Sequence, residues 1–251
     1  MTTVLKLGGS VITAKDRPET LDDTRLSALA DAMASAREAG DVDDLVVVHG
    51  GGSFGHHHAS DYGVSTTAGT HDPEAVLAIH GAMKTLNGFV IRRLRDRGVP
   101  AVPVHPLSVA HRDGEGTLSV PVGSVGTLLA EGFVPVLHGD LIAHAGEGTT
   151  VVSGDELVVS LARGIGADRV GLCSAVPGVL DDEGSVIDRI EAFSEVAAFV
   201  GASEHTDVSG GMAGKLRALL GLEVPASVFG PEDAPGFLAG EEPGTTVGGS
   251  G

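Results

Sequence analysis

Short runs of apolar, mostly β-branched residues alternate along this chain with stretches that repeat apolar residues at helical spacing. The run at 45–49 (LVVVH) is continuously apolar. This is typical of a strand with both faces buried, because a half-exposed strand would alternate. The stretch at 23–39 places Leu26 and Leu29 on one face and stops before Gly40, as an amphipathic helix does. We therefore expect an α/β protein, a three-layer αβα sandwich around a mostly parallel central sheet.

The same patterns predict the order of the elements. Strands are expected at 4–7, 45–49, 99–104, 133–137, 168–173 and 226–229, and helices at 23–39, 73–97, 155–165 and 211–222. Residues 111–116 and 144–150 show neither pattern and are expected to form a hairpin or loop. We divide the chain into an N-terminal lobe, residues 1–145, and a C-terminal lobe, residues 146–247, within one continuous domain.

The chain is strongly acidic, with a formal net charge of −18 from 34 acidic and 16 basic residues. A nucleic-acid-binding surface needs a basic footprint, so we expect no nucleic-acid partner. Many carboxylates with few lysines and 3% aromatic residues suit a halophilic, salt-rich cytosol, where salt screens the repulsion between carboxylates. An ordinary acidic protein is the alternative interpretation.

The only cysteine, Cys173, lies in an apolar run and is expected in the core, so no disulfide framework is predicted. The N-terminus enters the first expected strand without the pattern of a signal peptide. No apolar run reaches the roughly 18 residues of a membrane span. We expect a cytoplasmic protein without a membrane partner.

Three of the four lysines lie in or beside glycine-rich segments. Lys6 belongs to KLGGS, Lys15 follows shortly after, and Lys215 ends SGGMAGK, whereas Lys84 stands elsewhere. Glycine lets backbone N–H groups approach a phosphate closely, and lysine supplies a compact positive charge. The combination indicates phosphate chemistry.

Two of the glycine-rich segments follow expected strands. KLGGS (6–10) leaves the first strand at its carboxyl end, where open parallel sheets bind ligands, although a tight turn would use the same glycines. HGGGSFGH (49–56) satisfies the G-x-G-x-x-G pattern of dinucleotide-binding domains, with Asp72 or Glu74 at a suitable distance for a ribose. It does not follow the first strand, however, and a dinucleotide would leave the other segments unexplained. The consecutive histidines 56–58 are not expected to hold a metal, because neighbouring side chains rarely point at one centre.

Two later segments are expected helix starts. SGGMAGK (209–215) differs from a P-loop, because Ser209 stands where the first glycine belongs and Leu216 replaces the hydroxyl that would bind magnesium. A glycine-rich helix start that carries one lysine still suits the binding of an anion. The alternative is that Lys215 is simply solvated. In VSGDE (152–156), Asp155 either partners the helix dipole or orients lysines or magnesium.

Together these segments resemble the amino acid kinase superfamily. The matching motifs are KLGGSVIT, HGGGSFGH, SGDEL and TDVSGGMAGK. Within the superfamily, His56 after GSFG and Lys15 after the N-terminal glycines resemble the isopentenyl phosphate kinases of archaeal isoprenoid synthesis. Acetylglutamate and uridylate kinases share the first glycine pair and a glycine-rich second loop, but not GSFGH. The resemblance extends over residues 2–247.

The resemblance implies a role for each matching residue. The implied ATP-binding residues are Lys6, Leu7, Gly8, Gly9, Ser10, Gly52, Ala175, Gly178, Gly211 and Lys215. The implied substrate-binding residues are Gly51, Gly55, His56 and Gly154, and the implied catalytic residues are Lys6, Lys15, His56 and Lys215. Asp155 would organise the lysines, ATP and Mg²⁺ would be the cofactors, and the protein would be a homodimer. SAVPGVL departs from the family's TDVDGVY, because Ala175 and Pro177 replace two acids, which puts nucleotide contacts there in doubt.

The implied reaction transfers the γ-phosphoryl group of ATP to a small-molecule phosphate monoester, isopentenyl phosphate. Such an acceptor is already ionised, so the barrier is repulsion between two anions rather than the lack of a base. Lys6, Lys15 and Lys215 would supply positive charge, and His56 would donate a hydrogen bond to the acceptor.

Ile79, Met83 and Leu86, at helical spacing, either belong to the core or line a pocket for an apolar tail. Another kinase of the superfamily, an NAD-binding oxidoreductase and a non-catalytic anion sensor are the alternative functions.

Overall fold

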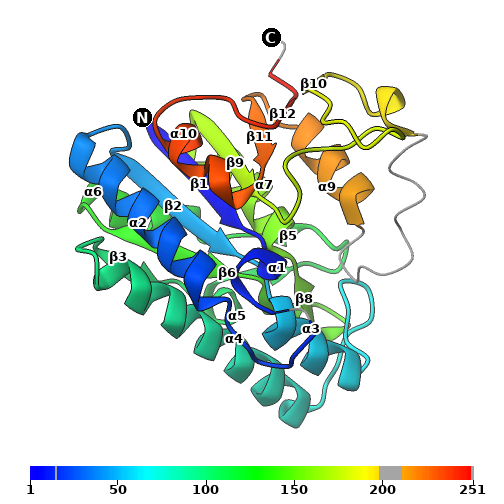
Figure 1. The fold of residues 1–251 in the computed structure, drawn as a ribbon. Helices are drawn as coiled ribbons and strands as arrows, with labels where there is room; N and C mark the ends of the chain where they lie inside the picture. The colour runs from blue at the N-terminus through cyan, green and yellow to red at the C-terminus, as the bar shows by residue number, and fades with distance from the viewer. Residues whose placement is uncertain (15, 198–210, 250–251) are drawn as a thin grey trace.

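An eight-stranded, mostly parallel sheet runs through the centre of the molecule (Figure 1). The computed structural model describes residues 1–14, 16–197 and 211–249. Across the sheet the strands are ordered β10 (Arg189–Ile190), β12 (Thr245–Val247), β11 (Ala226–Phe229), β9 (Arg169–Cys173), β1 (Thr2–Leu7), β2 (Asp44–His49), β6 (Val134–His138) and β3 (Ala101–Pro103). The β11–β12 pair is antiparallel and all the other pairs are parallel. The first strand thus lies in the middle, between strands from both halves of the chain.

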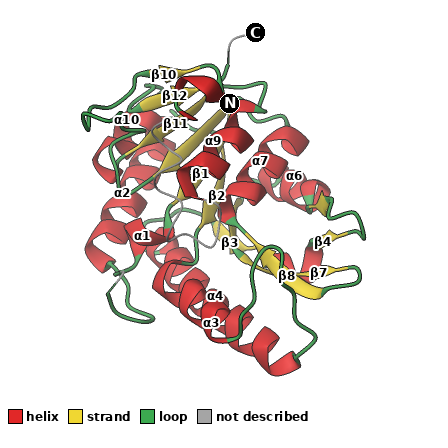
Figure 2. Ribbon diagram, turned by 90° about the vertical axis from the view of Figure 1, so that its right-hand side faces the viewer, coloured by secondary structure: helices red, strands yellow, loops and turns green. Residues whose placement is uncertain are grey.

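Helices cover both faces of this sheet, as Figure 2 shows. One face is covered by α2 (Asp23–Ala39), α4 (Pro73–Arg95) and α10 (Ala234–Leu238). The other is covered by α6 (Val122–Ala130), α7 (Gly154–Ile165) and α9 (Gly211–Leu220). The predicted three-layer αβα sandwich around a mostly parallel sheet is therefore confirmed.

The continuous apolarity of the central strands follows from these two layers. In β2, Val46 and Val48 pack into the cluster under α6 and α7, whereas Leu45 and Val47 pack into the cluster under α2 and α4. All four side chains are fully buried. Because successive side chains of a strand point to opposite faces, both sets must be apolar. Cys173, at the end of β9, lies in the same core as predicted.

A second, smaller sheet lies beside the lower part of the molecule in Figure 2. Its strands are ordered β5 (Leu118–Ser119), β4 (His111–Arg112), β7 (Asp140–His144) and β8 (Gly148–Val152). Strands β7 and β8 form the hairpin that the sequence allows at 144–150, and Gly146 in its turn and Gly148 at the start of β8 have positive φ. The predicted lobe boundary at residue 145 falls in this turn. Leu141 of β7 packs with Ala59 and Ile79, which anchors the hairpin to helices α3 (Gly52–Asp61) and α4.

Local signals set the ends of the main helices. The Asp22 side chain accepts a hydrogen bond from the Arg25 N–H at the start of α2, and Gly40 ends that helix in the left-handed conformation. Ser153 and Glu156 form a capping box at the start of α7.

The predicted long helices and central strands are present, with ends that shift by a few residues. Several elements were not predicted, among them α3, α6, the strands β5, β10 and β12, and the short segments α1 (Gly9–Ile12), α5 (Pro106–Val109), η1 (Phe193–Glu195) and η3 (Pro231–Asp233). The glycines of the GGGSFG segment indicate a turn, but only Gly50 and Gly51 link strand to helix, and α3 begins at Gly52. Packing of Phe54 and Ala59 into the interior outweighs the low helix propensity of this segment. Within the described ranges, each helix is too short or too polar to cross a bilayer.

Candidate functional site

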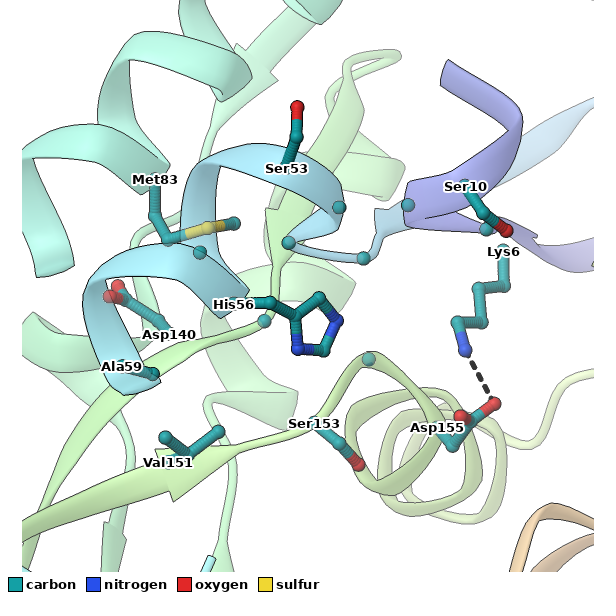
Figure 3. A pocket seen from close by; sticks show the side chains of 18 of the residues that line it. Lys6, Ser10, Ser53, His56, Ala59, Met83, Asp140, Val151, Ser153 and Asp155 are labelled. Atoms are coloured by element: carbon teal, nitrogen blue, oxygen red, sulfur yellow. Dashed lines mark ion pairs between the residues drawn. The ribbon is translucent and has the colours of Figure 1, made fainter. Parts of the chain in front are cut away.

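A cavity of about 1070 Å³ lies where four central strands end (Figure 3). The segments that follow β1, β2, β6 and β9 supply Gly8, Gly9, Ser10, Gly50, Gly51, Gly52, Ser53, Gly139, Asp140 and Ser174 to its lining. The first turns of α3 and α7 also face it. The first N–H groups of a helix have no partner within the helix and carry partial positive charge. The cavity therefore suits an anionic ligand.

The two N-terminal glycine-rich segments touch each other through their backbones. A Cβ atom on Gly9 would lie 2.3 Å from the backbone nitrogen of Gly52, and one on Gly50 would lie 2.7 Å from the nitrogen of Gly9. Thr13 joins them, because its hydroxyl donates to the Gly9 carbonyl and accepts from the Ser53 N–H. Part of the glycine content thus serves close packing of neighbouring strand ends, in addition to access for a ligand.

Lys6 reaches the cavity from the middle of the sheet and pairs with Asp155 at the start of α7 (Figure 3). Lys6 Nζ lies 2.6 Å from Asp155 Oδ1. Gly154 leaves room for the lysine, since a Cβ there would lie 3.1 Å from Lys6 Cε. Burial acts to raise the pKa of the Asp155 carboxyl, but the positive charges of Lys6 and Lys215 outweigh it, and the pKa is lowered. Asp155 is thus a carboxylate that pairs with Lys6, from the first half of the chain, and feels the charge of Lys215, from the second.

The three consecutive histidines lie on helix α3 and point in different directions. The His56 ring points into the cavity (Figure 3). His57 Nε2 lies 3.6 Å from Asp61, and His58 Nε2 lies 2.6 Å from Glu19 Oε1. Successive residues of a helix are turned by about 100° from one another. His57 also belongs to the cavity lining, with its Nε2 near Asp61, whereas His58 is not part of the described lining.

The structure brings most of the predicted site residues together. The cavity is lined by Lys6, Gly8, Gly9, Ser10, Gly51, Gly52, Gly55, His56, Gly154, Asp155 and Lys215. Gly211 is the first residue of α9, the helix that carries Lys215. Lys15 lies outside the described residues.

Leu7, Ala175 and Gly178 are among the predicted ATP-binding residues that do not belong to the described lining. Leu7 is fully buried in the core on the α2 side. Ala175 is exposed beyond the end of β9, and Gly178 packs tightly, since a Cβ there would lie 2.7 Å from the Thr245 hydroxyl. For Gly178, the need for glycine is explained by packing against β12.

Sequence reasoning did not select several lining residues, among them Ser53, Gly139, Asp140, Ser153, Ser174 and Met212. Gly139 and Asp140 follow a buried strand, as the selected glycines do. Their place after the run at 133–137 was the signal that could have identified them, because ligands bind at the carboxyl ends of parallel strands.

Comparison with known proteins agrees with this geometry. Residues 1–222 match the amino acid kinase family. The isopentenyl phosphate kinase of Haloferax volcanii is 61% identical over 244 residues, which cover 97% of each chain. That of Methanocaldococcus jannaschii is 30% identical and covers 98% of each chain. A solved structure of an isopentenyl phosphate kinase superposes with a TM-score of 0.84 at 27% identity, over 98% of this chain and 100% of that one.

The chain therefore belongs to the amino acid kinase family. Within that family it belongs with the isopentenyl phosphate kinases, as the motifs predicted. Acetylglutamate kinases are more distant relatives, such as that of Geobacillus stearothermophilus at 28% identity. The dinucleotide interpretation of GGGSFG is set aside by this assignment.

Proposed function

We propose that this protein transfers the γ-phosphoryl group of ATP to isopentenyl phosphate and forms isopentenyl diphosphate. The observation that carries the proposal is a single cavity in which Lys6, Lys215 and His56 meet glycine-rich strand ends and an apolar recess. Each of these groups has a separate task in a transfer between two anions.

The donor and acceptor would occupy different parts of the cavity. Beside Asp155, the ATP phosphates would lie against Lys6, Lys215 and the glycines of KLGGS. The acceptor phosphate would lie between Gly51, His56 and Gly154. In this arrangement the N-terminal lobe, 1–145, holds mainly the acceptor, and the C-terminal lobe, 146–247, holds mainly the nucleotide.

The chemistry asked of the protein is electrostatic. The acceptor oxygen already carries negative charge, so catalysis consists of bringing two anions together and neutralising charge on the transferring group. Lys6 and Lys215 supply fixed positive charge, and His56 donates a hydrogen bond to the acceptor. Asp155 orients Lys6 by a direct ion pair and interacts electrostatically with Lys215.

The lining also fits a magnesium ion that arrives on the nucleotide. Two of its carboxylates are already engaged, Asp155 by Lys6 and Asp140 by His80. The ion would thus be held mainly by the ATP phosphates, with the Ser10 hydroxyl as an oxygen donor of the lining. When bound, it would neutralise charge on the phosphoryl group in transit.

An apolar recess next to His56 would take the hydrocarbon part of the acceptor. Ile79 and Met83 of α4 line it with Ala59 and Val151, three of which are labelled in Figure 3. Leu86, the third residue of the predicted stripe, is fully buried in the core behind them. The predicted stripe is therefore partly pocket and partly core.

Turnover of ATP with a panel of acceptors tests the proposal. The panel contains isopentenyl, dimethylallyl and geranyl phosphates, acetylglutamate and uridylate, and ³¹P NMR identifies the product. We expect one ADP for each new diphosphate, with the highest kcat/KM for isopentenyl phosphate. Preference for acetylglutamate or uridylate, or no turnover of any prenyl phosphate, would refute the proposal.

We also infer that the protein works in the cytoplasm as a homodimer, as the family resemblance implies. Light scattering after gel filtration tests the oligomeric state. A mass of one chain of 25.2 kDa at working salt concentration would contradict it.

A further inference from the structure

Two neighbouring strands of the central sheet end in the same way. The parallel strands β2 and β6 each finish with a histidine followed by glycine, His49–Gly50 and His138–Gly139. The two histidines are register partners, and their rings stack with centroids 5.5 Å apart. Both side chains are fully buried. The glycines that follow them both line the cavity.

Each ring holds the glycine that follows it. His49 Nδ1 lies 3.1 Å from the Gly50 carbonyl oxygen, and His138 Nδ1 lies 2.9 Å from that of Gly139. Since a carbonyl only accepts, Nδ1 donates in both cases. Each glycine carbonyl is thereby bonded to a buried ring. A carbonyl oxygen that faced the cavity would repel a phosphate.

Both rings act as neutral donors. Burial lowers the pKa of His49 to about 4 and lowers that of His138 well below its ordinary value. A neutral ring that donates at Nδ1 accepts at Nε2, and His138 Nε2 accepts from Nδ1 of His105 at 2.9 Å.

His49 Nε2 lies 3.1 Å from the Asn87 side-chain oxygen, and the Asn87 NH₂ group has no partner among the described residues. Because Nε2 of a ring that donates at Nδ1 only accepts, we assign the amide with its nitrogen and oxygen exchanged, so that the NH₂ group donates to His49. Each ring is thus held at both nitrogens, so neither can turn to release its glycine.

Gly139 occupies a particular place in the cavity. A Cβ atom on it would lie 3.6 Å from the Gly154 nitrogen and 3.9 Å from the Gly51 nitrogen. These are two of the residues proposed to hold the acceptor phosphate. The Gly139 N–H donates to the His49 carbonyl at 2.9 Å, which couples the two strand ends. The missing side chain leaves open the space between the two amide groups.

We propose that Gly139 is a further acceptor-site residue. Because it has no side chain, the acceptor phosphate can lie directly against its Cα atom. His138 and His49 are positioning residues that hold the two glycine peptides for this purpose. The inference rests on the proposed function, because the phosphate it concerns is that of the acceptor.

The first test is Gly139→Ala. The added methyl group would meet its nearest neighbour, the Val152 oxygen, at 3.4 Å, an ordinary contact, so the fold should be retained. It would occupy the phosphate space, and we expect the KM for isopentenyl phosphate to rise at least about tenfold. The KM for ATP and the Tm should stay unchanged. Gly81→Ala is the control, since a Cβ there meets nothing within 4 Å. An unchanged acceptor KM in Gly139→Ala overturns the proposal.

The second test separates positioning from stability at His138. His138→Leu removes the donor to Gly139, whereas His138→Asn keeps an amide donor near the position of Nδ1. We expect His138→Leu to raise the acceptor KM several-fold at unchanged ATP KM. We expect the acceptor KM of His138→Asn to stay close to that of the wild type. Val136→Ala, on the same strand and equally buried, is the control for lost packing. A His138→Leu variant that only lowers the Tm, as Val136→Ala does, would show that the histidine is merely structural.

A third measurement distinguishes failure of this inference from failure of the proposed function. If the wild-type protein does not turn over isopentenyl phosphate, the proposed function is wrong. Phosphate binding at Gly139 is then tested separately, by measuring the Tm with inorganic phosphate in the presence of saturating ADP. We expect phosphate to raise the Tm of the wild type and not of Gly139→Ala. Equal shifts, or no shift in the wild type, overturn the role of Gly139.

Discussion

Replacing Lys6 by Met is expected to affect both stability and rate, because this lysine is the buried partner of Asp155. The Lys6 side chain is 10% exposed and that of Asp155 is 17% exposed, with 2.6 Å between the charged atoms. Methionine keeps most of the volume of the lysine but leaves the carboxylate without its nearest cation. Asp155 would then keep only the weaker electrostatic influence of Lys215.

The expected loss in the free energy of unfolding follows from the burial of the Lys6–Asp155 pair. Removing one partner of a buried ion pair costs about 3–5 kcal/mol when the other charge is left uncompensated. Lys215 remains nearby and the site opens to water, so we expect the low end, about 3 kcal/mol at pH 7. In the Lys6→Met variant, burial raises the pKa of Asp155. The loss should therefore shrink as the pH falls, because a protonated carboxyl needs no cation. Turnover should fall by about 10²–10³, the effect of removing one preorganised electrostatic donor.

Urea unfolding of a double-mutant cycle measures the stability effect. The cycle compares the wild type, Lys6→Met, Asp155→Leu and the double variant, and we expect the double variant to recover most of the loss. Lys84→Met is the control, since Lys84 is an exposed lysine outside the cavity lining. If Lys6→Met is as stable as the wild type, the pair does not stabilise the fold as assigned. If the variant turns over at a near-normal rate, Lys6 does not have the catalytic role assigned to it.

Three further predictions concern histidines and salt. His56→Ala should raise the acceptor KM and lower the rate with every phosphate acceptor, and His56→Gln should recover part of the activity. Steady-state kinetics would contradict this placement if His57→Ala or His58→Ala were the more damaging change. The folded-state pKa of His49, about 4, lies below the ordinary 6.5, and that of His138 is also lowered, so the unfolded state binds more protons in this range. Their contribution to stability is complete above about pH 6.5 and is lost as the pH falls toward 4. For His49 the loss between pH 7 and pH 5 is about 2 kcal/mol. Urea unfolding at the two pH values should show it, and a His49→Gln variant with the same pH dependence would refute it. Finally, the charge of −18 predicts that molar potassium chloride raises the Tm, and an unchanged or lower Tm would reject a halophilic origin of the acidity.

The sequence alone was sufficient to predict the layered fold and the edge of the sheet at which the site lies. The continuous apolarity of 45–49 and the periodicity of 23–39 are local properties, and both report burial by neighbouring layers. Glycines after successive strands predicted one site, because the carboxyl ends of parallel strands share an edge. The selection of Lys6, His56 and Lys215 as site residues depended on the same rule together with family resemblance.

The tertiary structure decided which of these residues meet and what each glycine is for. The pairing of Lys6 with Asp155 depends on α7 packing against β1, which no local pattern specifies. Gly9 is needed for contact with the second strand end, and Gly178 for packing on β12. The stacked pair His49 and His138 exists only because β2 and β6 are neighbours in the sheet. Strand order arises from contacts between residues far apart in the chain. Local propensity and periodicity therefore leave it open, and with it the geometry that gives the site its chemistry.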